Sequence, residues 1–237
     1  MIRAVVVTVL TLAYTLAAGF PFLIRALLIK NTDFLYKIGI SGARLALWLS
    51  GVQLEVHGLE KIPLGRAAIY MPNHQSNCDP PAVISILPPV LVMAKQEFFR
   101  VPVLGRAMIL RGFIPINRKN REQAIAAVDR AVAALEAGNS FLAFPEGTRS
   151  PDGRLQVFKK GLFMMAIKAH ALIVPISVSG ARRVMPKGQF AIHPGRVRIT
   201  VHDPIPAENY SLEQRQALIE ATRQAVLQGL DPDERPL

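Results

Sequence analysis

The chain has two differently patterned parts, and the change falls near residue 50. From Gly51 onward, short runs rich in Val and Ile alternate with stretches of helical periodicity. The runs predict strands at Val52–His57, Ala67–Pro72, Val90–Ala94, Phe113–Ile116, Phe141–Phe144, Leu172–Val178 and Val197–His202. Helices are predicted at Pro80–Leu87, Val101–Leu110, Arg121–Ala137, Lys160–Ala169 and Leu212–Gln228. This alternation predicts an α/β fold, in which a mixed, largely parallel sheet is covered by helices.

The first part of the chain contains one long uncharged stretch, from Ala4 to Ile24. As an α-helix, its 21 residues extend roughly 30 Å, which is about the thickness of the hydrocarbon core of a bilayer. Gly19 and Pro21 predict a break or kink near its end. A second helix is predicted over residues 32–49, where Trp48 is of a type that is enriched at membrane interfaces.

Three arrangements fit this N-terminal pattern. The segment is a cleaved signal peptide, a single membrane span, or a helix that enters one leaflet and returns through the second helix. Basic residues lie on both sides of the uncharged stretch, and residues 1–50 carry a net charge of +4, so the positive-inside bias orients the segment only weakly. We expect residues 1–50 to form N-terminal membrane-anchoring helices and residues 51–237 to form the α/β domain.

Composition narrows the classes of protein further. Of the 237 residues, 51% are hydrophobic and 19% are charged, which excludes an intrinsically disordered chain. The single Cys excludes an intramolecular disulfide and a Cys-based zinc finger, and the sequence contains no plausible metal cluster. A net charge of +11 in so apolar a chain suggests an anionic membrane surface, with nucleic acid as the rival interpretation. Because the basic runs lack interleaved aromatic residues, we expect no nucleic-acid binding.

A histidine and an aspartate lie in the segment that follows the second predicted strand. His74 lies in a turn, and Asp79 precedes Pro80, which suits the first position of a helix with Asp79 as its N-cap. Such a turn can bring the carboxylate back to the imidazole, fixing its tautomer and leaving the other ring nitrogen to accept a proton from a hydroxyl. On spacing alone, the alternative is that Asp79 only caps the helix. Cys78 is a second candidate nucleophile, although a small buried thiol is the simpler interpretation.

Basic residues follow three other predicted strands. Arg118 and Lys95 each come at the end of a strand, and Arg149 lies in a tight turn after a third. Glu146 shares that turn, so that one of the two charges could position the other. Active sites of open α/β sheets gather at strand ends, and guanidinium groups match the oxygens of a phosphate. We therefore predict a phosphate site around Arg118 and Arg149; the alternative for each is an ordinary solvated surface charge.

These segments together resemble a known family. Asn73-His74-Gln75-Ser76-Asn77-Cys78-Asp79 resembles the H-x-x-x-x-D box of the glycerolipid acyltransferases, in particular the 1-acylglycerol-3-phosphate acyltransferases. The segment from Gly112 to Arg118 resembles their second block, that from Phe144 to Ser150 their F-P-E-G-T-R-S block, and Val174-Pro175-Ile176 their fourth. The blocks run from about residue 70 to 180, and general similarity covers nearly the whole chain. Asn117 departs from the family, which often has Asp there, and this bears on how Arg118 is oriented.

The resemblance implies a fold like that of glycerol-3-phosphate acyltransferase and a direct acyl transfer. His74, oriented by Asp79, would deprotonate the sn-2 hydroxyl of lysophosphatidate, a membrane lipid. The alkoxide would attack the thioester of acyl-CoA or acyl-carrier protein without an acyl-enzyme, and would give phosphatidate for phospholipid biosynthesis. Neither a cofactor beyond this co-substrate nor a metal is implied. The substrate-binding residues would be Arg118, Glu146, Gly147, Thr148, Arg149 and, more weakly, Lys95.

The resemblance also implies where the protein works. Both acyl chains prefer lipid by roughly 0.8 kcal/mol per CH₂, so an enzyme docked in the leaflet avoids extracting them into water. In the family a two-helix N-terminal motif can lie in one leaflet, which favours that arrangement over a span. We expect a membrane-associated protein on an anionic surface, with its active site on the cytoplasmic face. Since the motifs report the chemistry more than the acceptor, another lysophospholipid, glycerol 3-phosphate or a lyso-aminolipid is the alternative acceptor.

Overall fold

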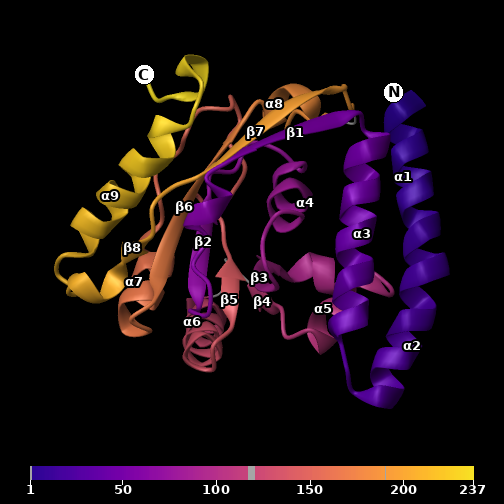
Figure 1. Cartoon of the computed structure of the whole chain (residues 1–237), viewed down its shortest axis with the longest axis horizontal. Helices are drawn as coiled ribbons and strands as arrows, with labels where there is room; N and C mark the ends of the chain where they lie inside the picture. The colour runs from indigo at the N-terminus through magenta and orange to yellow at the C-terminus, as the bar shows by residue number, and fades with distance from the viewer. Residues whose placement is uncertain (1, 117–120, 190) are drawn as a thin grey trace.

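The protein is an eight-stranded sheet with helices on both faces, joined to an N-terminal helical hairpin (Figure 1). The computed structural model describes residues 2–116, 121–189 and 191–237. The strands follow the order β1-β7-β6-β2-β5-β3-β4, and β8 pairs with β6. Their bounds are β1 Val52–His57, β2 Ala68–Pro72, β3 Val90–Lys95, β4 Ile114–Ile116, β5 Ser140–Leu142, β6 Leu172–Ser179, β7 Gly195–Val201 and β8 Ile205–Pro206.

The sheet is mixed and largely parallel, as the sequence pattern predicts. Strands β6, β2, β5, β3 and β4 all run in one direction. Strands β7 and β1 are parallel to each other but run opposite to β6. All five residues of β2 are buried, because helices cover both faces of the sheet at its centre.

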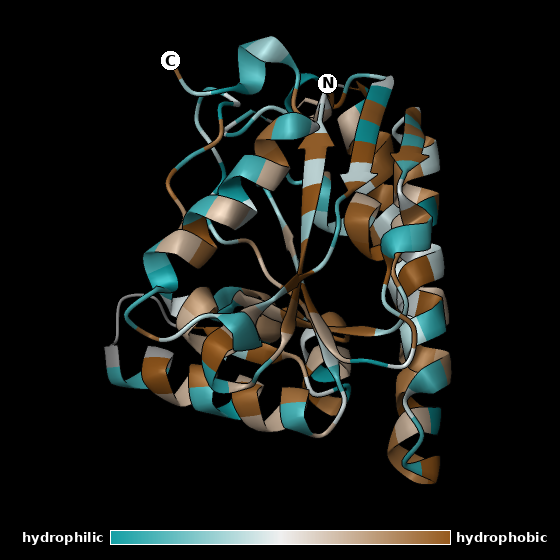
Figure 2. Cartoon of the chain, turned by 60° about the vertical axis from the view of Figure 1, so that its left-hand side comes forward, coloured by the Kyte–Doolittle hydropathy of each residue, from teal (hydrophilic) through white to brown (hydrophobic). Residues whose placement is uncertain are grey.

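Two helical layers cover the sheet and define two cores. Helices α6 (Arg121–Glu136), α7 (Lys160–Lys168) and α9 (Arg215–Gln228) pack on one face, which also buries Ile69 and Met71. Helices α4 (Asp79–Ile84) and α8 (Ala181–Val184), together with Leu47 of α3, pack on the other face, against Ala68 and Tyr70. Figure 2 shows hydrophilic and hydrophobic residues alternating along α6 and α9, as expected of helices with one buried side.

The remaining helices are short, and several bounds differ from the predicted ones. Helix α5 spans Leu104–Leu110, and 3₁₀ turns occur at Leu59–Lys61, Gln96–Arg100, Ala207–Asn209 and Pro232–Glu234. The helix predicted from Val101 starts three residues later, because Val103 takes a positive φ of 63° that no helix can contain. The strand predicted to reach Phe144 ends at Leu142, where the chain turns away into the loop that contains Pro145. Strand β8 and helix α8 were not predicted from the sequence.

The N-terminal segment is a hairpin of two antiparallel helical arms (Figure 1). Its first arm consists of α1 (Ile2–Tyr14), a π-helical turn (Thr15–Gly19) and α2 (Phe20–Ile29), and its second arm is α3 (Asp33–Leu49). The chain stays helical where a break or kink is predicted near Gly19 and Pro21: a π turn ends at Gly19, and Pro21 lies in the first turn of α2. The first arm is long and apolar enough to cross a membrane, and only 6% of its most apolar 18-residue window is buried. It is therefore a candidate membrane segment.

Candidate active site

The ends of three parallel strands bring the predicted site together. Strand β2 lies between β5 and β6, with Tyr70 opposite Leu142 of β5 and Pro72 opposite Ile176 of β6. Because the three strands run in the same direction, the loops that follow them leave from the same edge of the sheet. The loop after β2 contains His74, and the loop after β5 contains the predicted phosphate-binding turn.

His74 and Asp79 are in direct contact. The imidazole Nδ1 lies 2.7 Å from Asp79 Oδ2. The Asp79 side chain is fully buried, whereas 16% of the His74 side chain is exposed. Because a carboxylate only accepts hydrogen bonds, the nitrogen that faces it carries the proton and the Nε2 lone pair is left for a substrate. The predicted pairing of imidazole and carboxylate is present in the structure.

Asp79 stabilises the turn rather than the start of its own helix. The residue before it, Cys78, occupies the N-cap position of α4, so the predicted N-cap role of Asp79 is wrong. Its Oδ2 instead accepts hydrogen bonds from the backbone N–H groups of Gln75 and Ser76, each at 2.7 Å. One carboxylate oxygen thus closes the loop and orients the imidazole.

Two buried amide side chains attach this loop to β6. Asn73 Nδ2 donates to the carbonyl of Val178 at 2.9 Å, and Asn73 Oδ1 accepts from the Val178 N–H at 2.7 Å. Gln75 Nε2 donates to the same carbonyl at 2.9 Å. Sequence reasoning missed both residues, because their partner is 103 to 105 positions away along the chain. Two amides beside a histidine motif, directly after a strand, are the signal that could have found them.

Glu146 holds the backbone of His74. Its Oε1 accepts the His74 N–H at 2.6 Å, and its Oε2 accepts from Gln156, from the side-chain amide at 2.9 Å and from the backbone N–H at 3.3 Å. Glu146 is therefore bonded to these two residues and makes no ion pair with Arg149, which corrects the predicted mutual positioning. Burial raises the pKa of Glu146 to about 7, against the lowering effect of these hydrogen bonds.

The turn around Gly147 closes over the same histidine. Gly147 has a φ of +72°, and a Cβ there would lie 3.0 Å from Lys159 Cδ, so any other residue would be strained at this position. The Ser150 N–H donates to the carbonyl of His74 at 2.7 Å. On the ring side, Phe144 stacks on the imidazole with centroids 4.0 Å apart. The loop after β5 therefore contacts His74 through both its backbone and its ring.

Only one of the cations around this turn, Arg149, was predicted from the sequence. Arg149 is half-buried, and its carbonyl accepts a hydrogen bond from Lys187 Nζ at 2.5 Å. Thr148 is exposed, and its carbonyl accepts from Gln156 Nε2 at 3.2 Å. The Lys159 side chain lies next to Gly147. Lys159 and Lys187 were not among the predicted residues, although Lys159 lies within the conspicuous Phe158-Lys159-Lys160-Gly161 segment.

Of the two other predicted cations, Lys95 lies away from this site. Lys95 ends β3, which is separated from β2 by β5, and its exposed ammonium pairs with Glu97 Oε1 at 2.9 Å. Two strand spacings amount to about 10 Å, so Lys95 is at most peripheral to His74. Arg118 and the preceding Asn117 lie outside the described residues.

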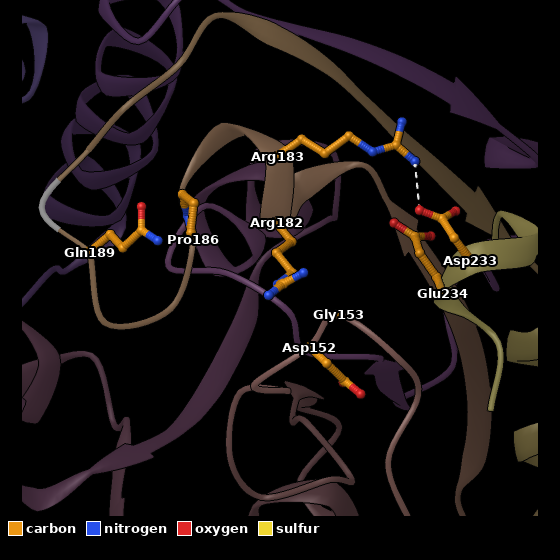
Figure 3. A pocket seen from close by; sticks show the side chains of 8 residues that line it. All are labelled: Asp152, Gly153, Arg182, Arg183, Pro186, Gln189, Asp233 and Glu234. Carbon is orange, nitrogen blue, oxygen red and sulfur yellow. Dashed lines mark hydrogen bonds and ion pairs between the residues drawn. The ribbon is translucent and has the colours of Figure 1, made fainter. Parts of the chain in front are cut away.

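A small pocket lies beside the loop, on the same edge of the sheet. It has a volume of about 250 Å³, and its lining includes Arg182 and Arg183 together with the acidic Asp152, Asp233 and Glu234 (Figure 3). The Arg183 guanidinium bonds Asp233 Oδ2 at 3.5 Å, and the Arg182 N–H donates to Gln75 Oε1 at 3.3 Å. His74 does not line this pocket, whose three acidic side chains outnumber its two arginines, so the pocket supports the loop rather than extending the phosphate site.

Cys78 is buried and unreactive in this setting. Burial and the neighbouring Asp79 charge raise the pKa of its thiol to about 12. A thiol with so high a pKa is protonated at neutral pH and is a poor nucleophile. Among the described residues, no group of three or more His, Cys, Asp or Glu side chains could hold a metal ion.

Comparison with known proteins assigns the chain to a family. The Acyltransferase family model matches residues 53–179, which include both loops described above. A 1-acyl-sn-glycerol-3-phosphate acyltransferase of Borreliella burgdorferi is 31% identical over 189 residues, covering 79% of this chain and 76% of the relative. The chain belongs to the acyltransferase family.

Further similarities narrow the group of relatives. A chloroplastic 1-acyl-sn-glycerol-3-phosphate acyltransferase of Arabidopsis thaliana is 37% identical over 155 residues, covering 65% of this chain but only 44% of the relative. The crystal structure of the 1-acyl-sn-glycerophosphate acyltransferase PlsC from Thermotoga maritima superposes with a TM-score of 0.78 at 27% identity, covering 96% of this chain and 95% of that one. The similarity to that structure thus includes the N-terminal hairpin as well as the α/β domain.

Proposed function

We propose that this acyltransferase moves an acyl group from a thioester to the sn-2 hydroxyl of 1-acyl-sn-glycerol 3-phosphate, giving phosphatidate. The single observation that supports this most is the 2.7 Å contact between His74 Nδ1 and the buried Asp79, at a partly exposed strand end. The relatives named above are acyltransferases that act on 1-acyl-sn-glycerol 3-phosphate, and acylation of its sn-2 hydroxyl gives phosphatidate.

The chemistry needs one base and a good leaving group. His74 Nε2 takes the proton of the sn-2 hydroxyl while that oxygen forms a bond to the thioester carbonyl carbon. The imidazolium that results is stabilised by Asp79. The tetrahedral intermediate then collapses, the carbon–sulfur bond breaks, and the thiolate takes up the proton from His74. No acyl-enzyme is formed, in agreement with the raised pKa of the Cys78 thiol.

The acceptor phosphate is held by the cations next to the catalytic loop. Arg149, with Lys159 and Lys187 close to the same turn, provides positive charge within the loop that also holds His74. Arg118 stays a predicted second arginine for the phosphate. Lys95 stays a weaker candidate for the same role. Glu146, Gly147 and Thr148 shape the turn. Since Glu146 bonds the His74 N–H, binding of the phosphate and placement of the base depend on one loop.

The hairpin places the enzyme in the lipid. Its first arm exposes apolar side chains along its length, and full extraction of an acyl chain into water would cost many times the roughly 0.8 kcal/mol of one CH₂ group. We favour insertion of the hairpin into one leaflet of an anionic membrane, with the active site on the cytoplasmic face. The donor is acyl-CoA or acyl-carrier protein.

An in vitro transfer assay tests the proposal. His74→Ala should reduce transfer to lysophosphatidate by about 10²–10⁴-fold, while His57→Ala, an exposed histidine that bonds Glu55 at 2.9 Å on β1, should have no effect. Folding and membrane association of His74→Ala should be unchanged. If His74→Ala turned over at a near-normal rate, His74 would not be the base.

A panel of acceptors in the same assay tests the substrate. We expect lysophosphatidate to exceed glycerol 3-phosphate, neutral lysophospholipids and lyso-aminolipids in kcat/KM. A higher rate with any of these would keep the mechanism but replace the proposed acceptor.

A further inference from the structure

A second cavity lies where the hairpin meets the α/β domain. It has a volume of about 510 Å³, and its lining includes Lys37 and Arg44 of α3 as well as Ser85 and Arg111 of the domain. Ser85 comes shortly before β3 begins, and Arg111 comes shortly before β4 begins. His74, in contrast, follows the end of β2, which runs in the same direction as β3 and β4. The cavity therefore lies at the opposite edge of the sheet from the proposed active site.

The cavity is strongly cationic for its size. Lys37, Arg44 and Arg111 line it with one acidic residue, Asp33. Within the residues that the structure describes, none of these three cations forms an ion pair with a carboxylate. The positive charge of the cavity is thus largely uncompensated by the protein.

The two arginines of the cavity are each held in place by a neutral neighbour. Arg44 Nη2 donates to the Ser85 carbonyl at 2.7 Å, and the Arg111 guanidinium lies 5.1 Å from the centroid of the Tyr36 ring. The Tyr36 hydroxyl in turn accepts the Val90 N–H at 3.2 Å. These contacts orient the guanidinium groups without neutralising them.

One donor of the cavity lacks an acceptor. Arg111 Nε is buried and has no hydrogen-bond partner among the residues that the structure describes. A buried donor without a partner destabilises a protein, so an arginine in this state is well suited to an external anion. Phosphate oxygens match the donor geometry of guanidinium, and the cavity is within the usual range of ligand sites, about 300–1,000 Å³.

The position of the cavity indicates the source of the phosphate. The first hairpin arm exposes apolar side chains, among them Leu12, Leu16 and Phe20. With these in the acyl region, the junction between α3 and the domain lies near the level of the lipid headgroups. A further cation, Arg25 of α2, lies 4.7 Å from the Phe34 ring centroid, and Lys37 Nζ lies 5.5 Å from the same centroid, so basic charge extends from the cavity along this level.

We propose that the cavity binds the phosphate group of an anionic phospholipid and thereby fixes the height of the α/β domain above the membrane. The proposal rests on the membrane docking of the hairpin that we proposed above, but not on His74 as the base. It adds a lipid site that is separate from the one for the reacting acceptor.

Lipid binding by the purified full-length protein in detergent tests the proposal. Native mass spectrometry would measure binding of dioleoyl phosphatidylglycerol, with dioleoyl phosphatidylcholine as the headgroup control. Arg111→Gln should weaken binding of phosphatidylglycerol about tenfold, since it removes charged hydrogen bonds to the phosphate. Arg106→Gln is the matched control, because it removes the same charge from α5 at an exposed position that does not line the cavity.

A second variant separates a local loss from misfolding. Lys37 is exposed on α3, so Lys37→Gln should fold normally and still weaken phosphatidylglycerol binding several-fold. Equal weakening by Arg106→Gln and Arg111→Gln would show diffuse attraction and would overturn the cavity site. Tighter binding of phosphatidylcholine than of phosphatidylglycerol would also overturn it.

Two further measurements identify the ligand and test the lipid site separately from the catalytic mechanism. Inorganic phosphate should compete only weakly; competition as strong as that of the lipid would make this a free-phosphate site and contradict our assignment. His74→Ala should bind phosphatidylglycerol like the natural protein. Full transfer activity of His74→Ala would contradict the catalytic proposal alone, whereas unchanged lipid binding by Arg111→Gln and Lys37→Gln would contradict this one alone.

Discussion

His74 is fixed through three different groups. Its backbone N–H donates to Glu146, its carbonyl accepts from Ser150, and its ring bonds Asp79. Two of these three partners belong to the loop after β5, and Phe144 of the same loop covers the ring face. A base held in this way needs little rearrangement before it takes a proton, which is what general-base catalysis requires.

The protonation of Glu146 makes the stability of this arrangement depend on pH. Its pKa is about 7 in the folded protein against an ordinary value of 4.5, so between these pH values the folded carboxyl group retains a proton that the unfolded chain releases. Its stabilising effect is complete below pH 4.5 and declines as the pH rises through 7. We expect the free energy of unfolding to fall by up to about 3 kcal/mol from this group over that range.

Glu146→Gln tests this dependence, because it removes the titrating group. Denaturant unfolding in detergent at pH 5 and pH 7.5 should show a smaller decrease for Glu146→Gln than for the natural protein. Glu136→Gln, at an exposed position in α6, should retain the natural decrease. A decrease of equal size in all three proteins would contradict the buried titration of Glu146.

The site residues show what a sequence pattern can and cannot predict. The His74–Asp79 contact is predictable, because both residues lie within one short turn. The partner of Glu146 is not, since Arg149 is near in sequence, whereas the His74 N–H is 72 positions away and is brought close only by strand pairing. Proximity in sequence favoured an ion pair between Glu146 and Arg149. The backbone N–H of His74 needs an acceptor, however, and Glu146 is that acceptor.

At the scale of elements, the two arms of the hairpin are held together where an aromatic ring of the first arm packs against a glycine of α3. The Tyr14 hydroxyl donates to the Ile38 carbonyl at 3.0 Å, and a Cβ on Gly42 would lie 2.8 Å from the Tyr14 ring. Gly39, one turn earlier on α3, has nothing within 4 Å of its Cβ position. Gly42 therefore allows the Tyr14 ring to pack closely on α3, whereas Gly39 has no such neighbour.

Alanine at these two positions should change stability in opposite directions. Gly42→Ala should destabilise the protein by about 1–3 kcal/mol, because the Tyr14 ring must move. Gly39→Ala should stabilise it by roughly 0.5–1 kcal/mol, because alanine favours a helix interior. Thermal unfolding in detergent measures both. Equal shifts for the two variants would mean that Tyr14 does not contact α3 closely.

The sequence predicts most elements but not how the hairpin is built. The strands and helices of the α/β domain follow from alternating apolar runs, and their bounds differ from prediction by a few residues where a turn intervenes. The continuous first arm does not follow, since Gly19 and Pro21 are ordinary helix breakers. A π turn that ends at Gly19 keeps the chain helical there, and Val103 Cγ1 of the domain lies 3.2 Å from where a Cβ on Gly19 would be.

At the scale of the whole molecule, the single Trp reports membrane docking. Trp48 is the only Trp of the chain, and it lies on α3 with 74% of its surface exposed. With the hairpin in one leaflet, addition of vesicles that contain phosphatidylglycerol should shift its fluorescence to shorter wavelength. Brominated lipids should quench it. Trp48→Phe is the control that removes the signal, and fluorescence unchanged by vesicles would contradict insertion of this part of the hairpin.

The closed hairpin has a consequence for the shape of the membrane. Because Tyr14 and Gly42 hold the two arms together, the hairpin enters the proposed leaflet as one wedge and adds area to that leaflet alone. A monolayer that is already stretched accommodates such a wedge most readily, and binding of amphipathic helices is sensitive to curvature. The protein should therefore concentrate on small, strongly bent vesicles and at the rims of membrane sheets, and lipid synthesis would be greatest where the bilayer bends.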